Sequence, residues 1–181
     1  YTDSYPEAAL DEAEGLSLDV SAALKDPLRR DLRDRFVITI DPVDARDFDD
    51  AISLERTPGG GYKLGVHIAD VSHYVAWDGH IDLEARHRTT SVYLADRVLP
   101  MLPERLSNDL CSLRPDEDRL AFTVDIELDA QGRVRHYDPY PSVIRSRVRM
   151  DYDGAEALLV RAGAVEYSVL EGAAEDVAAA E

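Results

Sequence analysis

FVITIDPVDARDFDDAISL, residues Phe36–Leu54, holds an aspartate-rich decapeptide between two apolar stretches. The run Phe36–Ile40 is rich in β-branched residues and predicts a buried strand, and Ala51–Leu54 begins a second apolar stretch. The decapeptide between them contains five aspartates: Asp41, Asp44, Asp47, Asp49 and Asp50. Such carboxylates repel one another unless a positive charge lies among them. Carboxylate oxygens suit Mg²⁺ or Mn²⁺ better than Zn²⁺, so the decapeptide is a candidate site for a metal that handles phosphates.

An aspartate-rich stretch also has simpler explanations. Aspartates often lie in solvated turns or cap helices, so the decapeptide alone does not establish a metal site. A calcium-binding EF-hand loop is excluded by position. When its pattern starts at Asp47, Ile52 takes the place of the glycine and Pro58 that of the final glutamate.

The composition describes a globular and strongly acidic chain. It has 181 residues, 45% of them hydrophobic, which is enough for one domain with a core. The net charge of −17 argues at first against a nucleic-acid partner. Five of these charges belong to Asp41–Asp50, where a metal would offset them. Much of the remainder lies in Asp3–Glu14 and Glu166–Glu181, which we expect to form solvated helix faces.

The single cysteine, Cys111, excludes an internal disulfide and fits a reducing cytoplasm. It lies in the apolar segment NDLCSL, and we expect it to be a buried packing thiol. No apolar stretch is long enough to span a bilayer, and Tyr1–Val20 lacks the order of a signal peptide. The sequence therefore predicts a cytoplasmic protein without a membrane partner.

The hydrophobic periodicity predicts a mixed α+β fold. The expected helices are Pro6–Glu14, Asp19–Leu24, Ile81–Thr89 and Tyr152–Ala162, with a helical turn at Arg105–Ser112. The expected caps are Ser17 or Asp19 for the second helix, Asp78 for the third and Asp151 for the last. The expected strands, besides Phe36–Ile40, are the hairpin Ala51–Glu55 and Tyr62–Ile68, then Ser91–Leu94, Leu120–Leu128, Arg133–Tyr137 and Val143–Met150.

Four blocks of the sequence resemble the RNB catalytic domain of the RNase II/RNase R family. TIDPVDARDFDDAISL, Thr39–Leu54, matches the family pattern of TID, a spacer and D-x-DDA. LGVHIADVSHYV, Leu64–Val75, resembles the next family block, and Thr89–Gly132 the one after it. DLRD, Asp31–Asp34, has its family position before the first strand. The resemblance, which runs from about Asp31 to about Leu159, implies an α+β fold with a mixed sheet and flanking helices.

The resemblance also implies a division of the chain. Residues 1–30 are expected to be a helical lead-in, and residues 31–181 the amino-terminal half of the RNB domain. The family's second signature, an HFTSPIRRY-like block with an arginine near the scissile phosphate, has no match, because the only histidine after Gly132 is His136 in RVRHYDPY. We therefore expect a fragment that is impaired alone. Its expected partners are the remaining half of the domain and OB-fold or S1-type modules.

Four aspartates receive roles from the resemblance. Asp41 and Asp50 are expected to bind metal directly or through water. Asp49 is expected to act on a second metal and the attacking water, and Asp47 to bind metal or support its ligands. Asp47 and Asp49 are thus the predicted catalytic residues, and Mg²⁺ the predicted cofactor, with Mn²⁺ as the alternative. Asp44 lies in the variable spacer and receives no role.

Two tyrosines are predicted to contact RNA because family tyrosines at the matching positions do so. Tyr93 is expected to stack on or clamp the 3′ end, and Tyr152 to follow a strand beside the RNA. Stacking accepts any base and contributes about 1–3 kcal/mol per base. For each tyrosine the alternative is a place in the core with the hydroxyl bonded to a neighbour, and for Tyr152 the two are equally weighted.

The strand Val143–Met150 carries arginines at alternate positions, Arg145, Arg147 and Arg149. Side chains at this spacing project from one face at intervals of about 6.6 Å and can follow a single-stranded phosphate backbone. The equally weighted alternative is an edge strand protected by charge. The histidines are scattered, and the spacing of His67 and His73 matches no standard zinc site, so we expect structural roles for them.

By resemblance, the reaction is Mg²⁺-dependent hydrolysis of single-stranded RNA in the 3′→5′ direction, with release of nucleoside 5′-monophosphates. Two other functions stay open. One is a catalytically silent RNB-like module that binds RNA or acts as a scaffold, and the other is a Mg²⁺ phosphohydrolase for small molecules. The intact set Asp41, Asp47, Asp49 and Asp50 argues against the silent module. The spelling DARDFDDA leans slightly towards RNase R within the family.

Overall fold

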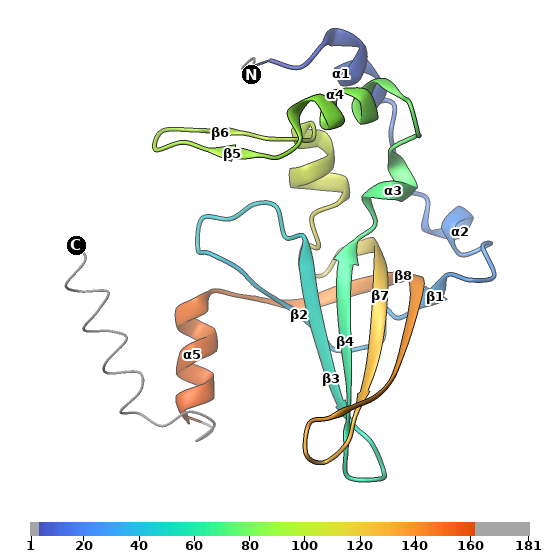
Figure 1. The fold of residues 1–181 in the computed structure, drawn as a ribbon, viewed down its shortest axis with the longest axis vertical. Coiled ribbons are helices and arrows are strands. Elements are labelled where there is room, and N and C mark those ends of the chain that lie inside the picture. Colours follow the sequence, from blue (N-terminus) through green and yellow to red (C-terminus); the bar gives the residue numbers. More distant parts are fainter. Residues whose placement is uncertain (1–3, 162–181) are drawn as a thin grey trace.

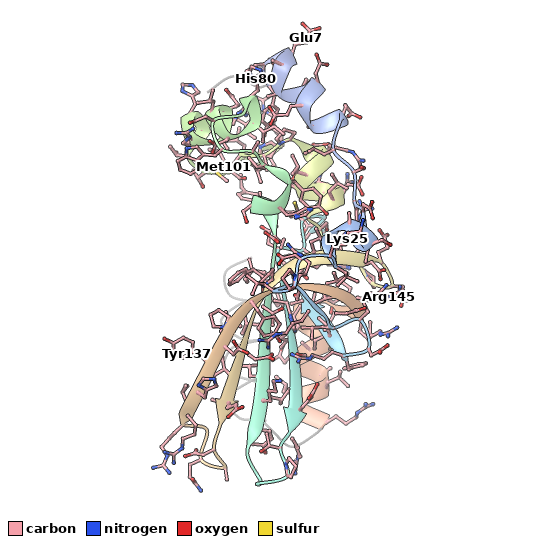
Figure 2. The ribbon with its side chains drawn as sticks, turned by 90° about the vertical axis from the view of Figure 1, so that its right-hand side faces the viewer. Glu7, Lys25, His80, Met101, Tyr137 and Arg145 are labelled. Carbon is pink, nitrogen blue, oxygen red and sulfur yellow. The ribbon has the colours of Figure 1, made fainter. Side chains whose placement is uncertain are left out.

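The computed structural model describes residues 4–161 of the chain. They form a barrel of strands with a group of helices at one end (Figure 1). Seen from the side, the labelled residues Glu7, His80 and Met101 lie at the helical end, whereas Tyr137 points outward from the barrel wall (Figure 2). The fold is therefore α+β with a mixed sheet and flanking helices, as the sequence predicted.

The elements have the following bounds. The helices are α1 (Glu7–Glu14), α2 (Val20–Ala23), α3 (Val71–Tyr74), α4 (His80–Arg88) and α5 (Tyr152–Arg161), with a π-helix, η1, at Leu106–Leu110. The strands are β1 (Arg30–Asp31), β2 (Val37–Ile40), β3 (Asp50–Arg56), β4 (Tyr62–Ala69), β5 (Val92–Tyr93), β6 (Val98–Leu99), β7 (Asp118–Leu128) and β8 (Val134–Met150).

The long strand β8 closes the barrel. The sheet runs in the order β1-β8-β2-β3-β4-β7, and β7 pairs again with β8. The neighbours β2–β3, β3–β4, β4–β7 and β7–β8 are antiparallel, whereas β8 is parallel to β1 and β2. Strands β5 and β6 form a separate hairpin that extends away from the barrel (Figure 1).

The caps show why two of the helices begin where they do. Asp19 accepts a hydrogen bond from the amide of Ala22 at 2.9 Å, so it caps α2 and Ser17 does not. Asp151 accepts from the amide of Gly154 at 2.7 Å, as expected for the start of α5. The prediction for Asp78 was wrong. Gly79 occupies the cap position of α4 and offers no side-chain bond.

The prediction of separate strands at Arg133–Tyr137 and Val143–Met150 was also wrong, because β8 runs without a break through Pro139 and Pro141. In the pairing of β7 with β8, Pro139 lies opposite Val124 and Pro141 lies opposite Phe122. Along the other side of β8, the pairing with β1 begins only at Ser142. A strand tolerates proline where the missing amide proton would face no neighbouring strand, and this part of β8 provides such an edge.

The barrel wall places polar side chains inside and apolar side chains outside. On β7, Thr123 and Asp125 are buried, whereas Phe122 on the opposite face is 45% exposed. The buried His67 lies 3.0 Å from Ser53 Oγ and 2.8 Å from Thr123 Oγ1. Buried polar groups are tolerated when they are hydrogen-bonded, so this network replaces apolar packing inside the barrel. His67 thus has a structural place, as expected.

The apolar core lies where the barrel meets the helices. Its fully buried members include Ile81, Leu106, Leu113, Leu120 and Ile144. The predicted packing thiol Cys111 belongs to this core at 1% exposure, and burial raises its pKa to about 12.

The helical end is joined to the start of the chain. The α1 residues Ala9 and Ala13 are buried, and the carboxylate of Glu12 accepts the amide of His80 at 2.7 Å. The predicted solvated stretch Glu166–Glu181 lies outside the described residues, as does Ala162 at the end of the last expected helix. Within residues 4–161, no helix has both the length and the apolar character needed to cross a membrane.

Candidate functional site

The acidic decapeptide is a loop whose backbone is fixed at several points. It leaves β2 at Asp41, whose amide donates to the carbonyl of Met150 at 3.0 Å. Its carboxyl end enters β3 at Asp50, and the carbonyl of Asp49 accepts the amide of Ala69 at 2.9 Å. In Figure 1 this loop emerges between the β5–β6 hairpin and α5. The aspartates are therefore presented on a loop that the barrel holds in place.

The structure brings together the four aspartates that the sequence predicted. The side chain of Asp49 is exposed, but the protein around its carboxyl displaces enough water to raise its pKa, and the negative charges of Asp47, Asp50 and Asp41 raise it further. The pKa of Asp41 is raised by burial and then by the charges of Asp50 and Asp47, while the hydroxyl of Thr39 and the charge of Arg149 oppose the rise. Each of these carboxyls lies within electrostatic reach of others, so together they form an acidic cluster, Asp41/Asp47/Asp49/Asp50.

Asp41 is the member whose environment is least satisfied. The residue is 7% exposed, and among the described residues its buried Oδ2 makes no hydrogen bond of good geometry, although the buried hydroxyl of Thr39, itself without such a bond, lies near enough to lower the pKa of Asp41. A buried carboxylate oxygen without a partner is unfavourable, because desolvation is not repaid by a hydrogen bond. A cation bound at this oxygen would remove that cost.

The donors of the acidic cluster suit a hard divalent cation. Within residues 4–161, no group of three or more His, Cys, Asp or Glu side chains forms a ready set of metal ligands. Mg²⁺ does not require one, since it usually keeps several waters and binds through one or two carboxylates together with substrate phosphates. The all-carboxylate chemistry and the unpartnered Asp41 oxygen therefore fit Mg²⁺ or Mn²⁺, and Asp41 and Asp50 are the residues we expect to hold it.

Tyr93 lies beside the acidic cluster and not in the core. It is 67% exposed on the β5–β6 hairpin, and its hydroxyl lies 3.4 Å from Asp47 Oδ2. The negative charge of Asp47 is the main reason that the pKa of Tyr93 is raised. The ring is therefore free to stack on a planar group while its hydroxyl faces the carboxylates.

The β5–β6 hairpin is anchored by a residue that the sequence did not single out. Arg88, at the end of α4, is 2% exposed and pairs with Glu84 at 2.7 Å. Its guanidinium also donates to the carbonyls of Pro100, at the far end of the hairpin, and Ser4. An arginine within a helical pattern is normally read as solvent-facing, so only the tertiary structure identifies this anchor.

The arginines of β8 are separated by their partners. Arg145 forms an ion pair with Asp118 at 2.6 Å, and Arg147 donates to the carbonyl of Arg33 at 2.9 Å. Both line a pocket whose other walls are Asp31, Arg33 and Asp34. Arg149 instead contacts the acidic loop, donating to the carbonyls of Pro42 and Val43 at 2.7 Å. The predicted continuous row of guanidiniums is thus divided between two places, and only Arg149 lies at the acidic cluster.

The alternative explanation of these arginines, an edge strand protected by charge, applies to part of β8. The strand pairs with β2 up to Met150. On the other side, among the described residues, an isolated bridge to Pro115 at Ser146 is the last contact of the sheet type. Arg147 and Arg149 therefore follow the point where that side of the strand becomes an edge.

Tyr152 is an exposed residue for which the described part of the chain shows no hydrogen bond to the acidic cluster. It is the first residue of α5 and is 60% exposed. No residue of α5 is buried, so the structure gives Tyr152 no packing role in residues 4–161. Its contact with RNA stays a prediction.

Comparison with known proteins shows which family the chain belongs to. The RNB domain family matches residues 29–179. Ribonuclease R of Thermotoga maritima is 53% identical over 156 residues, which cover 86% of this chain and 22% of that relative. Ribonuclease R of Aquifex aeolicus is 50% identical over 163 residues, covering 90% of this chain and 23% of the relative. The chain thus spans about a fifth of the length of the curated relatives that it matches.

Solved structures show the same fold. Mycoplasma genitalium RNase R, solved in complex with ribose methylated single-stranded RNA, superposes with a TM-score of 0.81 at 38% identity, covering 90% of this chain and 25% of that one. The yeast pseudonuclease Ssd1 superposes with a TM-score of 0.68 at 22% identity, covering 77% of this chain and 17% of that one. The second likeness concerns the fold alone.

Proposed function

We propose, because this chain belongs to the RNB domain family, that it carries the metal-binding part of a Mg²⁺-dependent exoribonuclease. Its substrate is single-stranded RNA, which it shortens in the 3′→5′ direction with release of nucleoside 5′-monophosphates. The Mycoplasma relative, solved with single-stranded RNA, supports this substrate class. The remaining part of an RNB domain and OB-fold or S1-type modules are the proposed partners within a longer enzyme, in line with the greater length of the relatives. A reducing cytoplasm suits the single buried thiol.

The observation that carries this proposal is the acidic cluster with its unpartnered buried oxygen on Asp41. Buried polar groups are normally hydrogen-bonded, so the weakly partnered carboxylate oxygen of Asp41, in the middle of four carboxylates, is the point at which we propose that the cation binds. The exposed ring of Tyr93 beside Asp47 adds a stacking surface at the same place. Together they offer contacts for a metal, a phosphate and a base.

The residues then divide the work of phosphodiester hydrolysis. When bound, Mg²⁺ stabilises charge on the phosphoryl oxygens and lowers the pKa of water. Asp41 and Asp50 hold the cation, and Asp47 supports it. Asp49, whose pKa is raised by burial and by its acidic neighbours, accepts the proton of the attacking water. Tyr93 stacks on the terminal base, and its hydroxyl stays with Asp47. Arg149 fixes the acidic loop through the carbonyls of Pro42 and Val43.

A catalytically silent module is the second candidate, because a pseudonuclease shares this fold. The two candidates differ in the chemistry of Asp49. If the chain is catalytic, Asp49→Asn abolishes cleavage and leaves RNA binding intact, whereas a silent module shows no cleavage to lose.

The test uses a 5′-labelled RNA with a single-stranded 3′ tail in the presence of Mg²⁺. We would assay the chain itself and a chimera in which it replaces the matching segment of Thermotoga maritima ribonuclease R, to which it is 53% identical. The control is Asp44→Asn, which removes a charge from the same loop at an exposed position outside the cluster. We expect a ladder that shortens from the 3′ end for the chimera and for Asp44→Asn, and none for Asp49→Asn. A chimera that folds, binds RNA and does not cleave it would contradict the proposal.

A further inference from the structure

We propose that Ser112 is a positioning residue for the acidic cluster, which it serves by clamping the segment Arg46–Phe48. Ser112 lies in the segment after the π-helix, well outside the decapeptide in the sequence. The inference rests on the function proposed above, since it explains how the carboxylates of Asp47 and Asp49 are held for a cation.

The clamp consists of hydrogen bonds to both ends of the segment. The hydroxyl of Ser112 donates to the carbonyl of Arg46 at 2.7 Å and accepts the amide of Phe48 at 3.1 Å. The next amide, that of Leu113, donates to the carbonyl of Phe48 at 2.9 Å. One fully buried serine therefore fixes the backbone on either side of Asp47.

Fixing the backbone also fixes the carboxylates. Phe48 is 8% exposed, and its ring lies under the guanidinium of Arg149 at 5.3 Å. Because the side chain of Phe48 is held inward, the carboxylates of its neighbours Asp47 and Asp49 are available to the acidic cluster. Like charges push a free loop towards arrangements that separate them. The clamp opposes this repulsion, so that the carboxylates stay together before a cation arrives.

The backbone of Ser112 is itself fixed by hydrogen bonds. Its carbonyl accepts Nε of the buried Arg119 at 2.8 Å, and Arg119 forms an ion pair with Glu117. Its amide donates to the carbonyl of Asp109, and that of Cys111 to the carbonyl of Leu106 at 2.9 Å, which completes the wide turn of η1. Single π-helical turns often occur beside functional sites, and here the turn delivers Ser112 to the acidic loop.

The test replaces the hydroxyl and measures both the clamp and the metal. Ser112→Ala removes the acceptor for the Phe48 amide and the donor for the Arg46 carbonyl. We expect hydrogen exchange of the Phe48 amide to accelerate, and the affinity of the 181-residue chain for Mn²⁺ to fall by about 10–100-fold, the range seen when a residue that supports metal ligands is lost. Neither change is expected from a serine that only packs.

The matched control is Ser146→Ala. Ser146 is also buried, at 1% exposure, and its hydroxyl makes a single long contact of 3.5 Å with the carbonyl of Val148. We expect its Mn²⁺ affinity to stay within about twofold of the parent chain. Should Ser112→Ala not fold, Ser112→Cys keeps the shape of the side chain while weakening both hydrogen bonds.

The outcomes separate the two proposals. If the parent chain binds Mn²⁺ and Ser112→Ala binds it equally well, the clamp is refuted while the metal site stands. If the parent chain binds no Mn²⁺, the metal-based function fails and the clamp loses its purpose, even when exchange at Phe48 responds. Faster exchange at Phe48 with weaker Mn²⁺ binding, in Ser112→Ala but not in Ser146→Ala, supports the inference.

Discussion

Two sets of acidic side chains in this protein have opposite surroundings. Inside the barrel, Asp125 is 4% exposed and is bonded to Arg35 at 2.6 Å, Lys63 at 2.9 Å and Tyr140 at 2.5 Å. Burial alone would raise its pKa, but these partners outweigh burial and lower the pKa to about 2. In the acidic loop, burial and like charges raise the pKa values of Asp41 and Asp49.

The difference is between a carboxylate that the fold satisfies and carboxylates that it does not. Asp125 gains from the fold, since it is more stable as an anion there than in the unfolded chain. Asp41 and Asp49 lose by folding, because loss of water around their carboxyls disfavours the charged form and the neighbouring carboxylates add repulsion. Carboxyls with perturbed pKa values that a fold does not satisfy are typical of functional sites. This contrast supports the cation site that we propose for the acidic loop, whereas the barrel carboxylate Asp125 already has cationic partners in Arg35 and Lys63.

The largest effect is expected from a substitution that breaks the buried ion pairs of Asp125. Asp125→Asn leaves the guanidinium of Arg35 with only the exposed Glu55, 3.5 Å away, as a carboxylate partner, and loss of one partner of a buried ion pair costs about 3–5 kcal/mol. Urea denaturation measures the free energy of unfolding. The control is Asp129→Asn, because Asp129 also has a lowered pKa but pairs with the exposed Arg133 and Arg135. If both variants unfolded at the same urea concentration, the distinction between buried and exposed pairs would be wrong.

The second prediction concerns acid and the same interior. Burial and the charge of Arg35 lower the pKa of His67 from 6.5 to about 4. Between pH 6.5 and pH 4, His67 binds a proton in the unfolded chain but not in the folded chain. The contribution of neutral His67 to the free energy of unfolding is therefore fully present above pH 6.5 and falls by roughly 3 kcal/mol as the pH drops towards 4. The acidic loop acts in the opposite sense over its own range, since Asp41 and Asp49 take up protons more readily when folded. Unfolding free energies measured from pH 7 to 4 should fall in the parent chain and stay flatter in His67→Gln, and equal slopes would refute the role of His67.

The sequence predicted the closeness of the four aspartates better than it predicted the interior of the barrel. The four aspartates are close together in sequence, so a short loop brings them together whatever surrounds it. The β7 segment LAFTVDIEL predicted a half-buried strand, and the strand is half-buried. Its inner face, however, carries Thr123 and Asp125, whereas Phe122 faces outward. Polar residues turn inward there because partners from distant strands satisfy them, and a local pattern does not reveal such partners.

The same limit explains the residues that sequence reasoning missed. Ser112 acts on a segment 64–66 residues away, and Arg88 reaches a carbonyl 84 residues away at Ser4. Alternation correctly placed Arg145, Arg147 and Arg149 along one strand, but their partners come from three other segments. Periodicity shows which side chains share a face, and only the closed barrel shows what that face meets.

The smallest effect is expected from a substitution in the acidic loop, and it tests the other half of the comparison. Asp41→Asn removes one of the mutually repelling charges and should stabilise the metal-free chain by roughly 0.5–2 kcal/mol, the size common for stabilising substitutions at strained sites. In the presence of Mg²⁺ the parent chain should instead be more stable than Asp41→Asn. A ligand that binds only the folded state contributes about 2.7 kcal/mol at 100 times its Kd, and the variant has lost the buried oxygen that we expect to hold it. Thermal unfolding with and without Mg²⁺ measures both effects, with Asp44→Asn as the control for charge alone. Should Mg²⁺ stabilise Asp41→Asn as much as the parent chain, Asp41 would not be a ligand, and the raised pKa of its carboxyl would reflect only a poorly solvated place in the fold.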